Sequence, residues 1–539
     1  MIGVRCDLVR HAVVDTSGAT PRIAFPRPYN AAADLIDRHL VAGRSERIAY
    51  RDDRESVTYA ALAERVARAG NALRALGVRR EERVMMAMLD TVDFVAVFLG
   101  AMKLGAVPVP VNTLLPADDY GYLLADSRAR VLVVSDCLLA KLAPAIAAAT
   151  ELAHVVSAET ALGGERGAGL RLEALLAAAS PTLAAADTTA DDVAFWLYSS
   201  GSTGAPKGAI HLHSHLLWTS VLYGSGVLGL SEDDVVFSAA KLFFAYGLGN
   251  ALTFPLAAGA TAVLRAGRVT PALVAEVMRA ERPTVFCGVP TLFASILADP
   301  AAGAETKGGA LRTSISAGEA LPRHIGEAWR ARFGTDILDG LGSTEMLHIF
   351  LSNRPADVRY GTSGKPVPGY ELALRGEDGS PVADGEEGSL WVRGPSSAIG
   401  YFNQREKSLA TFHGPWTRTG DRYVRDADGY HTYSGRGDDM LKVGGIWVSP
   451  FEVESALSSH EAVFEAAVVG AGDADGLVKP RAFVVLHDPA RASASLEDEL
   501  KAFVKSKLAP YKYPRWVVFV RELPKTATGK IQRFRLRAP

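Results

Sequence analysis

The stretch YSSGSTGAPKG, residues 198–208, has the side chains of a loop that could bind phosphate. Its hydroxyls can donate hydrogen bonds, its glycines let backbone N–H groups approach a ligand, and its lysine supplies a positive charge. This set suits a polyphosphate, although a Gly/Ser-rich loop of random origin is more often a plain surface turn. The candidate residues are Ser199, Ser200, Gly201, Ser202, Thr203, Gly204 and Lys207.

This loop is not a Walker A motif, which reads G-x-x-x-x-G-K-[ST] and opens a helix that holds the phosphates at its N-terminus. Gly201 and Gly204 are too closely spaced, and Gly208 stands where the magnesium-binding hydroxyl belongs. The flanking segments VAFWLYSS and GAIHLH predict a strand on each side of the loop. A Walker-type NTPase is therefore disfavoured.

Two further groups of residues could handle a nucleotide. Ser343, Thr344 and Glu345 bring two hydroxyls and a carboxylate together, an oxygen set that suits Mg²⁺ carried in with ATP, although an isolated S-T-E triplet is more often a helix cap. Asp421 and Arg436 are candidates to hold the two ribose hydroxyls, where the alternatives are a turn residue and a surface ion pair.

The composition is that of a globular enzyme with more than one domain. The chain has 539 residues, 48% of them hydrophobic and 22% charged, and its net charge is −2. This balance does not favour nucleic acid or an anionic membrane as a partner. Three distant cysteines and the lack of a signal-peptide pattern predict a cytoplasmic protein, with the cysteines as buried small hydrophobes.

The elements that must position these residues follow an α/β pattern. Helical segments such as residues 59–77 alternate with short apolar strands between about 30 and 350, which predicts layered, largely parallel sheets. Residues 360–435 are rich in Gly/Pro turns and short strands, and residues beyond 439 predict a small α+β domain. We therefore expect an N-terminal domain over 1–437, with a β-rich subdomain, and a C-terminal domain over 438–539.

Seven motifs in order resemble the acyl-adenylate-forming superfamily of acyl-CoA synthetases, nonribosomal adenylation domains and luciferases. They are YSSGSTGAPKG, SAGEALP (316–322), DGLGSTEM (339–346), EEGSLWVRGPSSAIGY (386–401), TRTGD (417–421), GRGDDMLKVGG (435–445) and PKTATGK (524–530). The resemblance implies that a carboxylate reacts with ATP to give acyl-AMP and pyrophosphate, and that a thiol then attacks the acyl-AMP. It also implies a mobile C-terminal domain.

The resemblance assigns roles to particular residues. Lys530, Thr344 and Glu345 are the expected catalytic residues, and a cation near the α-phosphate stabilises the transition state. Thr203 and Glu345 would bind Mg²⁺, and Asp438 would be the hinge of a domain rotation that replaces Lys530 by the segment expected to bind coenzyme A. That segment comprises Lys442, Gly444, Gly445 and Trp447.

The nucleotide-binding set extends beyond the first loop. Most members of the superfamily have an aromatic residue that stacks on adenine at the position of Leu341, so an aliphatic side chain would take this role here. Besides the loop residues, Asp421 and Arg436, the expected contacts are Gly318, Glu319, Ala320, Asp339, Gly340, Leu341, Gly342, Ser343 and Thr344.

The acid is expected to be aromatic. KLFFAYGLGN and GSTEMLHIFLSN resemble the benzoate-CoA ligases within the superfamily, and rigid aromatics can enclose a planar ring, although such stripes are more often simple core. Small Ala245 would leave room for the ring. The expected pocket comprises Phe244, Ala245, Tyr246, Gly318, His348 and Ile349.

Several alternatives stay open. A ligase for hydroxy-, amino- or halobenzoates, an adenylation enzyme that loads a carrier protein, a luciferase-like oxidase and a nucleotide sensor without catalysis are each compatible with parts of the pattern. His211, His213 and His215 would share one face if the strand after the loop continues, which makes a metal site conceivable, but no further ligand motif supports it. The sequence leaves open whether the chain forms a homodimer.

Overall fold

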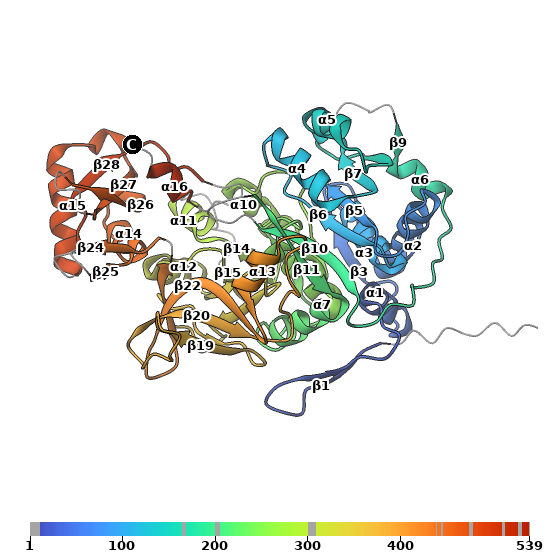
Figure 1. Ribbon diagram of the computed structural model, residues 1–539, viewed down its shortest axis with the longest axis horizontal. Helices are drawn as coiled ribbons and strands as arrows, with labels where there is room; N and C mark the ends of the chain where they lie inside the picture. The colour runs from blue at the N-terminus through green and yellow to red at the C-terminus, as the bar shows by residue number, and fades with distance from the viewer. Residues whose placement is uncertain are drawn as a thin grey trace, which may run out of the picture.

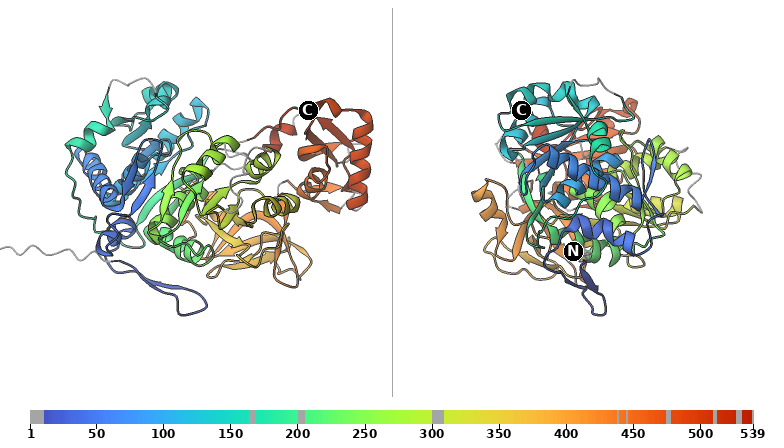
Figure 2. Two further views of the ribbon diagram at one scale, coloured as in Figure 1. Left: turned by 180° about the vertical axis from the view of Figure 1, so that it is seen from behind. Right: turned by 90° about the vertical axis from the view of Figure 1, so that its right-hand side faces the viewer.

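The computed structural model describes residues 11–163, 169–199, 205–299, 309–437, 439–443, 446–473, 478–508, 512–525 and 531–537. A large body formed by the N-terminal part of the chain carries a smaller C-terminal unit at one end (Figures 1 and 2). This arrangement confirms the α/β class with a β-rich region and a small α+β C-terminal domain.

A nine-stranded sheet is the central element of the large body. Its inner strands, from β16 to β3, run parallel, and antiparallel strands close both edges. In spatial order the strands are β18 (Lys365–Pro366), β17 (Ile349–Ser352), β16 (Ile337–Gly342), β15 (Thr313–Ser316), β14 (Val285–Gly288), β12 (Val235–Ser238), β13 (Thr261–Val263), β3 (Ile48–Arg51) and β4 (Ser56–Thr58).

A second sheet of five parallel strands lies beside the first and confirms the predicted parallel architecture. Its strands are β6 (Val107–Pro110), β5 (Arg83–Ala87), β7 (Val131–Ser135), β8 (His154–Ala158) and β9 (Leu170–Arg171). An antiparallel pair, β10 (Val193–Ser199) and β11 (Lys207–Leu212), runs between the two sheets in Figure 1.

Helices connect and cover these strands. Helix α2 matches the predicted helix at 59–77 to within two residues. The helices of the large body are α1 (Ala31–Val41), α2 (Tyr59–Ala75), α3 (Val92–Leu104), α4 (Ala117–Ser127), α5 (Leu139–Ala148), α6 (Leu172–Ala178), α7 (His213–Thr219), α8 (Ala245–Leu248), α9 (Phe254–Ala258), α10 (Pro271–Ala280), α11 (Pro290–Ala298), α12 (Arg323–Phe333) and α13 (Arg405–Thr411). The 3₁₀ turn η1 (Asp136–Leu138) precedes α5, and the π-helical segments η2 (Ser220–Ser225) and η3 (Gly249–Thr253) follow α7 and α8.

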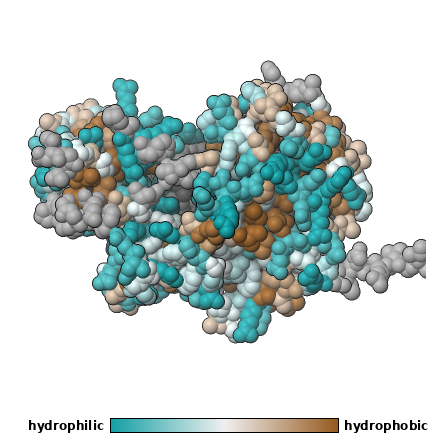
Figure 3. Space-filling view, in the orientation of Figure 1, coloured by the Kyte–Doolittle hydropathy of each residue, from teal (hydrophilic) through white to brown (hydrophobic). Residues whose placement is uncertain are grey.

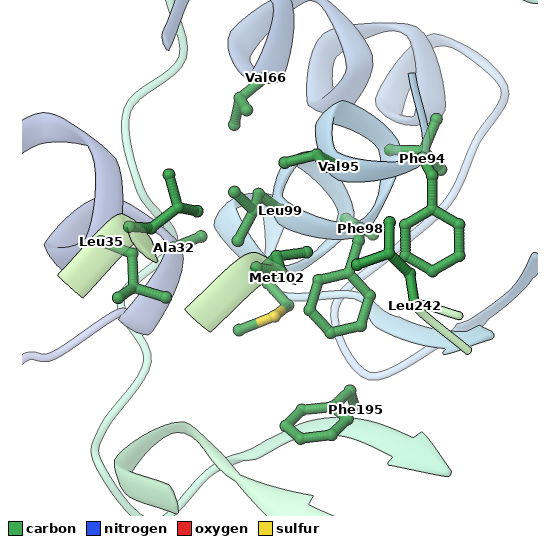
Figure 4. Packing of buried hydrophobic residues seen from close by; sticks show 14 of the residues in the cluster. Ala32, Leu35, Val66, Phe94, Val95, Phe98, Leu99, Met102, Phe195 and Leu242 are labelled. Carbon is green, nitrogen blue, oxygen red and sulfur yellow. The ribbon is translucent and has the colours of Figure 1, made fainter. Parts of the chain in front are cut away.

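The hairpin of β10 and β11 flanks the predicted phosphate loop, and we call it the phosphate hairpin. The core beneath it is built from α1, α2, α3 and β10. Figure 4 shows Phe98 of α3 facing Phe195 of β10, and their ring centroids lie 5.6 Å apart, edge to face. Helices α2 and α3 pack closely because each has a glycine where they cross, and a Cβ atom on Gly70 would lie 2.8 Å from the carbonyl oxygen of Gly100. The strand that leads into the hairpin therefore rests on a tightly packed base.

The β-rich subdomain is one antiparallel sheet, as the turn-rich segment at 360–435 predicts. Its strands are β19 (Glu371–Arg375), β20 (Glu387–Arg393), β21 (Phe412–His413), β22 (Trp416–Arg425) and β23 (His431–Arg436). Strand β23 continues through Arg436, one residue beyond the predicted end of the β-rich segment at 435.

The C-terminal unit has the predicted helices and strands. Its elements are β24 (Leu441–Val443), β25 (Ile446–Val448), α14 (Pro450–Ser458), β26 (Val463–Gly472), β27 (Val478–Leu486), η4 (Pro489–Arg491), α15 (Ala494–Lys507), β28 (Trp516–Phe519) and α16 (Arg533–Leu536). At the other end of the chain, β1 (Val13–Asp15) and β2 (Arg22–Ala24) form a hairpin that projects from the large body (Figure 1). In the described part of the chain, no helix is both long and apolar enough to cross a membrane.

Candidate active site

The hairpin of β10 and β11 holds the ends of the predicted phosphate loop. Ser199 pairs with Lys207 at the loop end of the hairpin, which confirms the predicted strand on each side of the loop. The loop residues between them, Ser200, Gly201, Ser202, Thr203 and Gly204, lie outside the described residues, and so does the Thr203 half of the predicted metal site.

A short segment, residues 399–402, pairs with β11 as a further strand. Ala209 forms a bridge with Tyr401, the N–H of Ile210 donates to the carbonyl of Gly400, and the N–H of Phe402 donates to the carbonyl of Gly208. The motif at 386–401 therefore reaches the phosphate hairpin. On the face of the molecule shown in Figure 3, hydrophobic residues gather around β11 and α13. Ile399 and Leu409 are each more than half exposed.

The loop that carries Ser343, Thr344 and Glu345 connects β16 to β17 and is fixed through its backbone. His211 Nε2 donates to the carbonyl of Thr344 over 2.8 Å, and the N–H of Ala398 donates to the carbonyl of Glu345 over 2.7 Å. Ser343 accepts a hydrogen bond from the N–H of Met346, as a residue that caps a turn does. The loop thus rests against both the phosphate hairpin and the segment before Tyr401.

The Glu345 carboxylate meets the phosphate hairpin directly. Its Oε1 accepts hydrogen bonds from Tyr401 at 2.7 Å and from Ser199 at 3.3 Å, and Lys207 Nζ lies 3.4 Å from the same Tyr401 oxygen. Burial lowers the pKa of Lys207, while the negative charge of Glu345 opposes that shift. The site therefore collects a cation, a carboxylate and hydroxyls at one end of the hairpin.

This donor set fits Mg²⁺ that arrives with a triphosphate. Mg²⁺ in nucleotide sites keeps several waters and binds one or two carboxylates together with phosphate oxygens. Glu345 supplies one such carboxylate. Within the described ranges there is no cluster of three or more His, Cys, Asp and Glu side chains that could hold a metal by itself.

The three histidines do not share one face of a strand, because the strand does not continue past Leu212. The strand ends at Leu212 and α7 begins at His213, so His211 lies on the strand while His213 and His215 lie on the helix. His213 Nδ1 accepts from the N–H of Ala31 at the start of α1, and the Nδ1 atoms of His211 and His215 lie 3.1 Å apart. The described contacts are those of structural histidines.

Asp421 and Arg436 lie opposite each other on β22 and β23. Their backbones are in register, and Arg436 Nη1 donates to Asp421 Oδ1 over 3.2 Å. The Asp421 side chain is nearly buried, whereas that of Arg436 is 44% exposed. A carboxylate and a guanidinium are therefore held side by side, as the prediction for two ribose hydroxyls requires.

The predicted base pocket follows β15 and β16. Gly318 has φ +95°, a conformation that favours glycine, and Glu319 and Ala320 come next along the chain. Asp339 is buried, which raises its carboxyl pKa well above the usual range, and Leu341 packs partly buried against the core. Gly340 and Gly342 allow β17 to lie close, because a Cβ atom on Gly342 would lie 2.7 Å from the carbonyl oxygen of His348.

The predicted ring pocket is assembled from α8 and the start of β17. His348 Nε2 donates to the carbonyl of Tyr246 over 3.3 Å, and the His348 ring packs against Tyr246 and Phe254 with centroids 5.7 and 4.5 Å away. Ala245 begins α8 and is half-buried, and Ile349 is buried at the first position of β17. Phe244 packs edge to face on Phe243, with centroids 4.4 Å apart.

Burial lowers the pKa of His348 to about 3, so its ring is neutral at physiological pH. Because a carbonyl only accepts, the single hydrogen of that neutral ring is on Nε2. The buried Nδ1 atom is then an acceptor, and among the described residues it has no hydrogen-bond partner.

Several predicted residues of the C-terminal unit lie outside the described part, namely Lys530, Asp438, Gly444 and Gly445. The backbones of Lys442 and Trp447 pair across β24 and β25. The N–H of Ile531, directly after Lys530, donates to Glu319 Oε1 over 3.3 Å. This bond joins the lysine motif to the predicted base pocket.

Two residues of the site were not predicted. Tyr401 closes the quoted motif GPSSAIGY, but nothing in the sequence places its hydroxyl beside Glu345 and Lys207. His211 was considered as a metal ligand and instead holds the loop before Glu345.

Cys137 is exposed, contrary to the prediction of buried cysteines, whereas Cys287 is buried as predicted.

Comparison with known proteins assigns this site to a family. Residues 38–402 match the AMP-binding enzyme family, and residues 452–530 match the AMP-binding enzyme C-terminal domain. The chain belongs to the AMP-binding enzyme family. The two matched ranges lie in the large body and the C-terminal unit, respectively.

Individual members of the AMP-binding enzyme family are similar over nearly the whole chain. A benzoate-CoA ligase of Thauera aromatica is 58% identical over 98% of this chain and 99% of its own length. A 4-hydroxybenzoate-CoA/benzoate-CoA ligase of Rhodopseudomonas palustris is 51% identical over 95% of this chain and 94% of its own. The crystal structure of a benzoate CoA ligase from Burkholderia xenovorans LB400 is 52% identical, with a TM-score of 0.88, and the match covers 95% of this chain and all of that one.

Proposed function

We propose that this protein converts benzoate, ATP and coenzyme A to benzoyl-CoA, AMP and pyrophosphate through a benzoyl-AMP intermediate. The observation that carries the proposal is the 58% identity to a benzoate-CoA ligase over 98% of the chain. Two contacts of the β16–β17 hairpin support it: Glu345, between the two strands, accepts a hydrogen bond from Ser199 of the phosphate hairpin, and His348, just before β17, bonds the carbonyl of Tyr246 in the predicted ring pocket.

In the first step, a benzoate oxygen attacks the α-phosphorus of ATP and the bond to the β-phosphate breaks, which releases pyrophosphate. Lys207 and the hydroxyls of the hairpin loop would hold the departing phosphates, and Lys530 would stabilise the charge that develops at the α-phosphate. Mg²⁺ bound with ATP would neutralise phosphate charge, with Glu345 as its protein ligand. The proximity of Ile531 to Glu319 supports the placement of Lys530 near the nucleotide.

In the second step, the sulfur of coenzyme A attacks the benzoyl carbonyl carbon and AMP leaves. We propose that the C-terminal domain, from Asp438 onward, rotates so that Lys530 withdraws and the Lys442–Trp447 segment faces the site. The C-terminal unit stands at one end of the large body (Figure 2), which fits a domain that can rotate. Domain closure of this kind is a known means of gating a site.

The fixed aromatic side chain of Tyr246 supports benzoate as the acid. Tyr246 is anchored by its hydroxyl, which donates to the carbonyls of Ile315 at 3.0 Å and Gly288 at 3.2 Å, so its ring is held in one orientation. A rigid aromatic wall favours a planar ring over a flexible chain, because the wall loses little conformational entropy on binding.

The free cysteines Cys137 and Cys287 fit a reducing cytoplasm, where we propose that the enzyme acts.

A ligase for hydroxybenzoate is the second candidate. The acceptor at His348 Nδ1 favours it, since a ring hydroxyl could donate there. The name of the Rhodopseudomonas relative also joins both acids.

An ATP-dependent thioester assay tests the proposal. Benzoate, 4-hydroxybenzoate, 2-aminobenzoate, cyclohexenecarboxylate and a short fatty acid are compared by kcat/KM, with coenzyme A and with a carrier protein as acceptor. We expect benzoate with coenzyme A to give the highest value. A higher value for a fatty acid, or for a carrier protein as acceptor, would overturn it.

A further inference from the structure

Tyr401 lies between two groups that the proposed reaction requires. Its hydroxyl donates to Glu345 Oε1 over 2.7 Å, and its oxygen lies 3.4 Å from Lys207 Nζ, at a distance suited to accepting a hydrogen bond. The same ammonium group lies 4.4 Å from the centroid of the Tyr401 ring, within the range of a cation–π contact. One side chain therefore contacts both the phosphate-loop lysine and the predicted metal-binding carboxylate.

The position of Tyr401 is fixed by its backbone and its packing. Its N–H donates to Ser408 Oγ over 2.9 Å, its backbone bridges to Ala209 of β11, and its ring packs on Phe412 with centroids 5.3 Å apart. The residue is only 6% exposed. The hydroxyl is thus held at one point between Lys207 and Glu345.

The Lys207 ammonium group and the Glu345 carboxylate both contact the Tyr401 hydroxyl, and their opposite charges attract each other. Glu345 favours the charged form of Lys207, against the larger effect of burial on its pKa. If the two formed a direct ion pair in this half-buried site, both charges would be satisfied by each other. A triphosphate and its cation would then have to break that pair in order to bind.

We propose that the Tyr401 hydroxyl is a positioning group that separates Lys207 from Glu345 and keeps both oriented toward MgATP. Lys207 stays available for phosphate oxygens, and Glu345 stays available for the cation. The inference rests on the proposed function only in that MgATP is the ligand of this site.

The variant Tyr401→Phe tests this role, because it keeps the ring and removes only the hydroxyl. We expect the Kd for MgATP, measured by calorimetry without any acid, to rise about tenfold, the effect of one hydrogen bond to a charged group. The KM for ATP should rise similarly, while the KM for benzoate stays within about twofold of the wild type. An unchanged Kd for MgATP would overturn the proposal.

Tyr198→Phe is the matched control. Tyr198 belongs to the same hairpin, and its hydroxyl also donates to a carboxylate, that of Asp126, at 2.7 Å. We expect this variant to leave the Kd for MgATP unchanged. If both variants weakened MgATP binding equally, or if Tyr401→Phe lowered the melting temperature and every kinetic constant together, the role would be merely structural and the proposal wrong.

A double-mutant cycle with Lys207→Met shows whether the hydroxyl acts through the lysine. We expect Tyr401→Phe to change the Kd for MgATP much less in the Lys207→Met background than in the wild type, whereas equal changes in both backgrounds would contradict the proposal. Because MgATP binding is measured without acid, an enzyme that prefers another acid would refute the proposed function and leave this test intact.

Discussion

Among single residues, Ala245 and His348 bear most directly on the choice of acid. Ala245 is the small residue at the start of α8, between Phe244 and Tyr246, and His348 is held to the same helix through the carbonyl of Tyr246. We propose that Ala245 limits the size of the ring pocket and that His348 Nδ1 is an acceptor for a polar ring substituent.

Enlarging Ala245 should narrow the range of acids. For Ala245→Leu we expect kcat/KM to fall about tenfold more for 4-hydroxybenzoate and halobenzoates than for benzoate, since added methyl groups exclude ring substituents first. Benzoate thioester formation, measured in parallel, is the internal control. Equal losses for benzoate and for the substituted acids would place Ala245 outside the ring pocket.

At the scale of elements, the junction of β11 and α7 shows what the sequence could and could not reveal. The alternation in GAIHLH correctly predicts the strand, and extending it to His213 and His215 gives the wrong face, because the backbone turns into a helix at His213. Local patterns predicted α2 and the mixture of helices and strands in the C-terminal unit because these segments have a clear hydrophobic period. The contacts of Tyr401 and His211 escaped prediction because their partners lie 56 and 133 residues away in the chain.

The histidines of this junction should make stability depend on pH. Burial lowers the pKa of His211 and His213 to about 4 and holds that of His215 well below its ordinary value, whereas unfolded histidines titrate near pH 6.5. Below about pH 6.5 the unfolded chain therefore binds more protons than the folded one, so the stabilisation is complete above that pH and is lost as the pH falls toward 4.

We expect each of these histidines to contribute a slope of about 1.4 kcal/mol per pH unit to the free energy of unfolding between pH 6 and pH 4.5. Urea denaturation at several pH values measures it. His215→Gln should reduce the slope by about 1.4 kcal/mol per pH unit, the contribution of one proton. A slope that His215→Gln does not alter would mean that the ring is protonated in the folded protein.

At the scale of the whole molecule, the C-terminal unit contacts the large body where the nucleotide is expected. The hydrogen bond from Ile531 to Glu319 brings the end of the lysine motif to the base pocket. Arg533 and Arg537 pair with Asp439, next to the expected hinge. The tail that carries the lysine motif is therefore tied to the chain just beyond position 438.

Removing the lysine should separate the two half-reactions. For Lys530→Ala we expect benzoate-dependent exchange of pyrophosphate into ATP to fall by about 10²–10³-fold, because a cation at the α-phosphate is lost. The reaction of coenzyme A with supplied benzoyl-AMP should stay within about threefold of the wild type, since Lys530 has then left the site. If both half-reactions failed together, a rotation about Asp438 would not describe this enzyme.

The β16–β17 hairpin carries the predicted adenine contacts Asp339 to Gly342 on one strand, and it carries His348 and Ile349 at the start of the other. The acid and the nucleotide would thus share one wall, whose two strands approach so closely at Gly342 that a methyl group has no room. If one substrate displaces this wall, the binding site of the other substrate changes as well. Thermodynamic reciprocity requires that whatever factor benzoate applies to ATP affinity, ATP applies to benzoate affinity.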